Sequence, residues 1–98
     1  MRVEFSPESQ SDLEAIGDYI ARDNPLRADS FLDEISDAAL SLGQWPNRAP
    51  VSGVHPAVRR WVHGAYNIYF EVLSDRVRVL RILNAALPVT ASMFGKPL

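Results

Sequence analysis

Arginine is the residue type most suited to binding chemistry in the second half of the chain. Arg59 and Arg60 lie in one segment with strand-like periodicity, and Arg78 and Arg81 lie in another. A guanidinium group donates paired hydrogen bonds to carboxylates and phosphates. Neighbouring strand positions point to opposite faces, so one arginine of each pair must face the helices or a sheet edge and needs a partner there. Each arginine therefore has two interpretations, a structural ion pair or a contact with an acidic partner.

The residue types that carry most enzyme mechanisms are scarce. The chain has no cysteine, which excludes disulfides, thiolate metal sites and a cysteine nucleophile. The two histidines, His55 and His63, fall in a loop and a turn without metal-ligand spacing, and we interpret them as solvated polar residues. No glycine-rich phosphate loop or serine nucleophile motif is present. These features favour a non-catalytic protein without cofactor or metal.

Charge is divided unevenly along the 98 residues. Residues 1–50 hold four arginines and ten acids, whereas residues 51–98 hold five arginines, one lysine and two acids. The basic half is a candidate surface for an acidic partner. The whole-chain pI of about 5.6 argues against a dedicated nucleic-acid-binding protein.

No apolar run reaches the ~20 residues that a membrane helix needs. Met1 leads directly into a strand-like segment, so we expect no signal peptide and a cytoplasmic location.

Hydrophobic periodicity predicts an α+β fold in the order β-α-α-β-β-β. Ser6-Pro7 and Asn24-Pro25 are typical helix starts, with a capping side chain followed by proline. We expect the two helices to form a hairpin on one face of an antiparallel sheet, with several arginines on the other face. Trp45 is expected to anchor the long loop to the core. The predicted elements are a strand at 2–5, helices at 7–22 and 25–42, and strands at 58–62, 66–72 and 77–83.

Four ordered motifs resemble the ParE branch of the RelE/ParE toxin superfamily of bacterial type II toxin–antitoxin systems. The first is Val3-x-Phe5-Ser6 followed by Asp12-Leu13-x-x-Ile16-x-x-Tyr19-Ile20, and the second is Asn24-Pro25-x-x-Ala28-x-x-Phe31 with Ile35. The third is Val58-Arg59-Arg60-Trp61-x-x-Gly64-x-Tyr66-x-Ile68-Tyr69-Phe70, and the fourth is Val79-Leu80-Arg81-Ile82-Leu83. Each motif alone is generic, but the ordered set spans about residues 3–83. The resemblance implies a single RelE/ParE-like toxin domain over residues 1–98.

The resemblance also implies partners and contact residues. A ParE-like toxin inhibits DNA gyrase, and with it replication, until a ParD-like antitoxin wraps an acidic, partly disordered segment across the toxin. This implies a hetero-oligomer with no membrane contact and no sequence-specific nucleic-acid binding. The implied antitoxin contacts are Arg59, Arg60, Tyr69, Arg78 and Arg81. The implied target-facing residues lie in the C-terminal stretch: Met93, Phe94 and Lys96.

Two other functions remain open for such a chain. One is a ribosome-dependent mRNA endonuclease of the RelE type, in which Arg60, Arg81, Tyr66 and Tyr69 would supply the charge and the acid–base groups. Many family members place a histidine and an arginine after the last strand, but residues 84–87 here are Asn-Ala-Ala-Leu, which argues against that activity. The other is an inactive member that only binds its antitoxin and regulates their operon.

Overall fold

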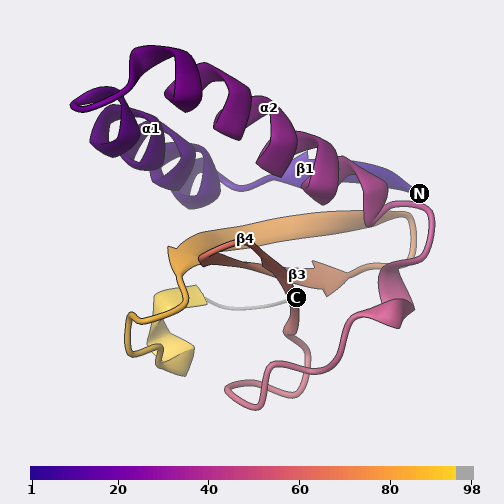
Figure 1. Ribbon diagram of the computed structural model, residues 1–98. Helices are drawn as coiled ribbons and strands as arrows, with labels where there is room; N and C mark the ends of the chain where they lie inside the picture. The colour runs from indigo at the N-terminus through magenta and orange to yellow at the C-terminus, as the bar shows by residue number, and fades with distance from the viewer. Residues whose placement is uncertain (95–98) are drawn as a thin grey trace.

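The computed structural model describes residues 1–94 of the chain. One strand precedes a pair of helices, three strands follow, and a single 3₁₀ turn ends the described part (Figure 1). The predicted order β-α-α-β-β-β is confirmed. The elements are β1 (Arg2–Phe5), α1 (Pro7–Ala21), α2 (Pro25–Ser41), η1 (Pro46–Arg48), β2 (Arg59–His63), β3 (Tyr66–Val72), β4 (Arg76–Asn84) and η2 (Ala91–Phe94).

The sheet is mixed, which corrects the antiparallel sheet predicted from the sequence. Its strands lie in the order β1-β4-β3-β2. The β2–β3 and β3–β4 pairs are antiparallel, but β1 runs parallel to β4, with Val3 opposite Val77 and Phe5 opposite Val79. The chain leaves β1 through two helices instead of a tight turn, and such a crossover permits parallel pairing.

Both helices begin where the sequence predicts. The Ser6 side chain accepts a hydrogen bond from Ser9 N (3.1 Å), and the Asn24 side chain accepts one from Arg27 N (3.0 Å). Each cap is followed by a proline, which fits the first helical position because no N–H is needed there. The helices pack as a hairpin on one face of the sheet, at the top of Figure 1.

Hydrophobic side chains are buried on both faces of the sheet. Between the helices and the sheet the core contains Ile16, Phe31, Ile35, Leu42, Ile68, Phe70, Val77, Val79 and Ile82. A second, smaller cluster lies on the other face, where η2 covers part of β3 and β4: Val58, Tyr69, Leu80, Leu83 and Phe94. The C-terminal segment therefore closes part of the face that the sequence predicts to be open. No helix within residues 1–94 is long and apolar enough to cross a membrane.

The loop between α2 and β2 is not anchored by Trp45. That side chain is 63% exposed, so the expectation that it packs into the core is wrong. The buried anchor is Ala49, whose carbonyl oxygen accepts a hydrogen bond from Arg59 Nη1 at 2.6 Å. The second tryptophan, Trp61, packs against the main core, with the Arg48 guanidinium 4.4 Å from its ring centroid. A short polar contact to the loop backbone thus replaces the expected aromatic anchor.

Candidate partner-binding surface

Arg81 is held inside the fold by Asp12 of α1. Its Nε and Nη2 donate to the two carboxylate oxygens of Asp12 at 2.8 and 2.9 Å, and Nη1 donates to Met93 O at 3.2 Å. The hydrogen bonding to Asp12 raises the pKa of Arg81 above its ordinary value. Both side chains are largely buried, so Arg81 takes the structural role that the sequence leaves open for one arginine of each pair.

The position of this ion pair follows from the unequal lengths of β1 and β4. The pairing with β1 ends at Val79, which accepts a hydrogen bond from Ser6 N at 2.9 Å. Beyond it, Ser6 Oγ donates to Leu80 O (2.8 Å) and Ile82 N donates to Asp12 Oδ2 (2.9 Å). Side chains from the start of α1 thus replace the missing strand. A bulge opposite Tyr69 leaves Leu80 without a register partner, so Arg81 lies next to α1.

Arg59 is also engaged within the fold. Besides Ala49 O, its Nη1 lies 3.5 Å from Asn47 O, so its charge holds the carbonyl groups of the preceding loop. The alternation argument is confirmed for Arg59 and Arg60, since Arg59 finds a partner inside the protein. It is wrong for Arg78 and Arg81, because the bulge places them opposite Glu71 and Tyr69, which share one face of β3, although Arg81 still finds an internal partner in Asp12. Arg60 and Arg78 remain as the arginines available for contacts on the second face of the sheet.

Arg78 and Arg76 form a basic strip on that second face. They lie two residues apart on β4 and both reach Glu4 of β1, at 3.5 Å from Arg78 Nε and 3.1 Å from Arg76 Nε. Arg76 also donates to Asp75 at 2.9 Å. Glu71, which is buried, lies across from Arg78 in the register. Sequence reasoning missed Arg76, although its two-residue spacing from Arg78 placed both on one face.

Tyr69 and Phe94 are packed against each other. Their ring centroids lie 5.0 Å apart, and the residues are 3% and 6% exposed. The Tyr69 hydroxyl accepts a hydrogen bond from Asn67 Nδ2 at 3.3 Å. Met93 is half-buried beside them. Neither ring offers a contact surface while η2 is docked, whereas Lys96 lies outside the described residues.

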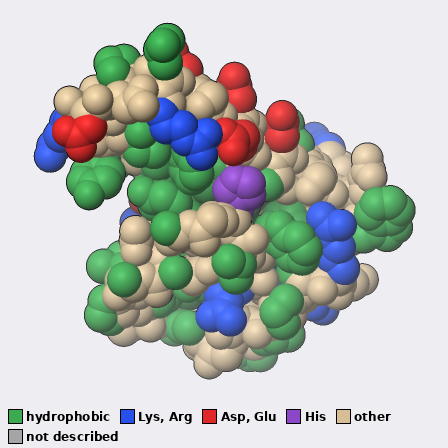
Figure 2. Space-filling model, viewed as in Figure 1, with side chains coloured by type: hydrophobic (Ala, Val, Ile, Leu, Met, Phe, Trp, Pro, Cys, Tyr) green, Lys and Arg blue, Asp and Glu red, His purple; other side chains and the backbone are tan. Residues whose placement is uncertain are grey.

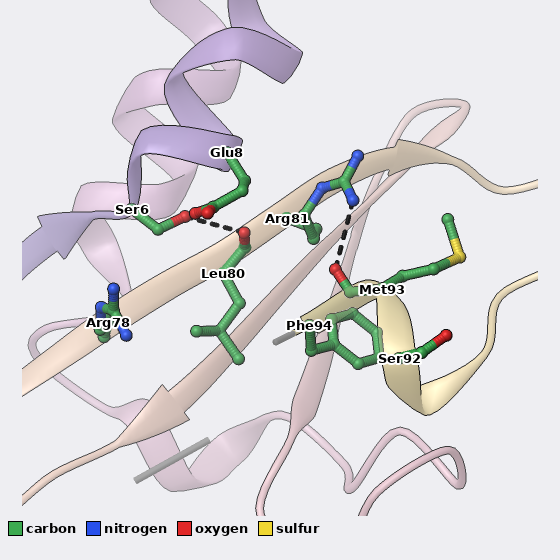
Figure 3. A pocket seen from close by; sticks show the side chains of 8 residues that line it. All are labelled: Ser6, Glu8, Arg78, Leu80, Arg81, Ser92, Met93 and Phe94. Carbon is green, nitrogen blue, oxygen red and sulfur yellow. Dashed lines mark hydrogen bonds between the residues drawn. The ribbon is translucent and has the colours of Figure 1, made fainter. Parts of the chain in front are cut away.

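A pocket of about 340 Å³ opens between the start of α1, β4 and η2 (Figure 3). Arg81 and Arg78 lie on its walls, with the Glu8 carboxylate among them. Figure 3 shows Arg81 directed towards Met93 O and Ser6 directed towards Leu80 O. Both side chains thus donate hydrogen bonds to backbone carbonyl oxygens. Neither histidine lines this pocket. Charged side chains therefore line the pocket, but the charge of Arg81 is already balanced by Asp12.

The histidines contribute to packing and turns. The His63 ring lies 5.9 Å from the Phe31 ring, and His55 Nδ1 accepts a hydrogen bond from Ala57 N at 3.0 Å. In the described part of the chain, no three His, Cys, Asp or Glu side chains are grouped so that they could hold a metal ion.

The surface is hollowed between the helical hairpin and the sheet, and hydrophobic side chains line both walls (Figure 2). Acidic side chains gather on the hairpin above the hollow. Phe31 of α2 is buried in the core behind this surface, with its ring 5.5 Å from that of Tyr66 and the Arg27 guanidinium 5.3 Å from its centroid. Arg27 in turn forms an ion pair with Glu34. An apolar hollow and a separate basic face suit a ligand that is both apolar and acidic.

Comparison with known proteins identifies the class. Residues 3–86 match the family model described as the ParE toxin of the type II toxin–antitoxin system parDE. The sequence and the fold thus place the chain among the toxins of type II toxin–antitoxin systems. Within this class, the chain belongs to the ParE toxin family.

A solved structure supports the fold independently. The chain is similar to one from the chromosomal ParDE TA system of P. aeruginosa, with 24% sequence identity and a TM-score of 0.77. The match covers 86% of this chain and 95% of that chain. It confirms the arrangement of a helix pair on a four-stranded sheet. No curated protein sequence matches the chain.

Proposed function

We propose that this toxin inhibits DNA gyrase, blocks replication in the bacterial cytoplasm, and is neutralised by direct binding of a ParD-like antitoxin. It performs no chemistry on nucleic acid and acts through binding alone. Membership of the ParE family supports the proposal. The target and the antitoxin are inferred from the family.

The observation that carries the non-catalytic part is the state of Arg81. Cleavage of RNA through its 2′-hydroxyl needs a base, an acid and positive charge that is free to meet the transition state. Arg81 is bound at three nitrogens by Asp12 and Met93, and the buried Tyr69 hydroxyl is bound by Asn67. Two of the groups that a nuclease would use are thus occupied within the fold.

The antitoxin part is supported by the chemistry of two surfaces. A disordered ligand gains affinity from apolar anchors and charge-assisted hydrogen bonds. The hollow beside the hairpin offers the first, and the face that carries Arg60, Arg76 and Arg78 offers the second. We therefore propose Arg60 and Arg78 as antitoxin contacts, add Arg76, and leave out Tyr69, which is buried.

Pulse labelling of DNA and protein synthesis, minutes after induction of the toxin alone, tests the proposed target. We expect DNA synthesis to fall first, and co-expression of a ribbon-helix-helix protein encoded beside the toxin to prevent the fall. Supercoiling by purified gyrase should then be inhibited by the toxin and restored by that antitoxin. An earlier fall of protein synthesis would contradict the proposal and favour mRNA cleavage on the ribosome. If neither process is affected, the protein would be an inactive member that only binds its antitoxin and regulates their operon.

A further inference from the structure

A groove of about 430 Å³ lies between α1 and α2, and all of its lining residues belong to these two helices. It is therefore separate from the hollow between the hairpin and the sheet. Its base is apolar, with Gly17 and Ala28 buried and Leu32 half-buried. A Cβ on Gly17 would lie only 2.8 Å from Leu32 Cδ1, so the two helices approach closely at the base of this interhelical groove.

Carboxylates line the exposed part of the interhelical groove. Glu14 and Asp18 come from α1 and Asp29 comes from α2, and all three residues are exposed. None of them forms an ion pair with another residue in the range 1–94. Asp12, on the same helix as the first two, is instead bound to Arg81. The groove thus combines an apolar base with negative charge that the described part of the fold does not balance by ion pairs.

An exposed leucine adjoins the groove. Leu26 is 83% exposed, more than any other large hydrophobic residue within residues 1–94. It follows Pro25, which lines the groove, and lies three residues before Asp29 on α2. Residues three apart are neighbours on the surface of a helix. A partner seated in the groove would therefore contact Leu26 as well.

We propose that the interhelical groove is the surface by which the toxin binds gyrase, through a basic and partly apolar segment of that enzyme. The proposal rests on the proposed function, which supplies the target. An enzyme that binds DNA carries lysine and arginine where it meets the phosphates, and the carboxylates of the groove attract the same groups. The C-terminal residues expected to face the target fit less well, since Phe94 is buried against Tyr69.

Two other occupants suit the interhelical groove less well. An acidic segment of the antitoxin would be repelled by its carboxylates, which places antitoxin and target on different faces of the toxin. A second copy of the toxin would have to bring its basic sheet face to the groove, where Arg76 and Arg78 are already bound to Glu4. Such a head-to-tail contact does not close into a dimer.

Asp29→Arg is the informative variant, and Asp37→Arg is its matched control. Both residues are exposed on α2, but Asp37 does not line the groove. In supercoiling assays with purified gyrase, we expect half-inhibition to need roughly tenfold more of the Asp29→Arg toxin than of the Asp37→Arg toxin, because the new charge repels a basic segment. Both variants should bind the antitoxin as tightly as the unaltered toxin does, and melting curves should show that both are folded.

A second pair of variants tests the apolar contact. Leu26→Ala shortens the leucine beside the groove, whereas Leu40→Ala shortens a leucine that is also exposed on α2 but lies outside it. We expect Leu26→Ala alone to weaken the inhibition of gyrase severalfold, because it removes a side chain that the target would bury. Neither substitution should affect folding, since both side chains are exposed in the free toxin.

Each outcome decides between distinct conclusions. Equal inhibition of gyrase by the two arginine variants would overturn the groove as the target surface but leave the proposed function intact. Failure of the unaltered toxin to inhibit gyrase would overturn the proposed function itself. Loss of antitoxin binding in Asp29→Arg, with inhibition unchanged, would assign the groove to the antitoxin and overturn the proposal. Self-association of the free toxin that Asp29→Arg abolishes would assign it to a second copy, with the same consequence. If Asp29→Arg does not fold, the leucine pair decides, because equal inhibition by Leu26→Ala and Leu40→Ala contradicts a target seated in the groove.

Discussion

Asp12 accepts hydrogen bonds from both the side chain of Arg81 and the backbone N–H of Ile82. One carboxylate on the first helix therefore satisfies the edge of β4 and neutralises a strand arginine at the same time. Asp12 and Arg81 are 69 positions apart in the sequence, so this contact joins the first helix to the last strand of the sheet.

Loss of this carboxylate should destabilise the toxin. Asp12→Ala leaves the Arg81 guanidinium and Ile82 N–H without their acceptor, and we expect a loss of about 2 kcal/mol in the free energy of unfolding. Urea denaturation measures it. The double variant Asp12→Ala/Arg81→Met should recover part of the loss, because it removes the unpaired charge. Additive effects of the two substitutions would contradict the coupling.

Phe94 should contribute more to stability than its neighbour Met93. Phe94→Ala removes a ring packed on Tyr69 and Leu80, so we expect a loss of about 3 kcal/mol, against about 1 kcal/mol for the half-buried Met93→Ala. Chemical denaturation of both variants measures the two losses in the free energy of unfolding. Deletion of residues 92–98 would remove this packing along with any target contact. The point variants are therefore the better test of a target-facing role, and similar stabilities would show that η2 is not docked on the sheet.

Two glycines that lie close to other segments of the chain should respond differently to substitution by alanine. A Cβ on Gly43 would lie 2.2 Å from the backbone oxygen of Met1, whereas one on Gly17 would lie 2.8 Å from the flexible end of Leu32. We expect Gly43→Ala to cost about 2 kcal/mol of unfolding free energy, because the N-terminal backbone must shift. Gly17→Ala should change stability by less than about 1 kcal/mol, since the gain in helix propensity offsets a side-chain adjustment. Thermal melting of both variants checks the order.

Charge reversal on the second sheet face should weaken antitoxin binding. Arg78→Glu places a carboxylate beside Glu4 and Glu71, and we expect antitoxin affinity to fall by about tenfold or more. Arg22→Glu, at the exposed end of α1, is the control with the same charge change. The affinity of the unaltered toxin should also fall with added salt, because the contacts are partly exposed. Equal affinities of the two variants would place the antitoxin elsewhere.

Local signals predicted the elements well. Ser6-Pro7 and Asn24-Pro25 mark helix starts because capping and proline geometry depend on adjacent residues. Tyr66, Ile68 and Phe70 alternate along β3 and all pack into the core against the helices, as the two-residue periodicity of a strand requires. These features are set within a few residues, and the structure confirms them.

Features that depend on distant segments could not be predicted in the same way. The parallel pairing of β1 depends on the path of two helices, and the burial of Tyr69 depends on where Phe94 returns. Alternation correctly placed Arg59 and Arg60 on opposite faces, but it does not hold for Arg78 and Arg81, because a bulge lies between them and Arg81 pairs with Asp12, which is far away in the sequence. Which arginines can contact a partner therefore depends on the internal ion pairs that form in the folded protein.

The two tryptophans lie in different environments, so tryptophan fluorescence can report on the surroundings of β2. Trp45 is in water, whereas Trp61 lies on β2 against the core and beneath Arg48. With Trp45 replaced by phenylalanine, all tryptophan fluorescence comes from the edge strand. A ligand that covers this edge then excludes water and quenchers from the indole, whereas one confined to the hairpin leaves its emission unchanged.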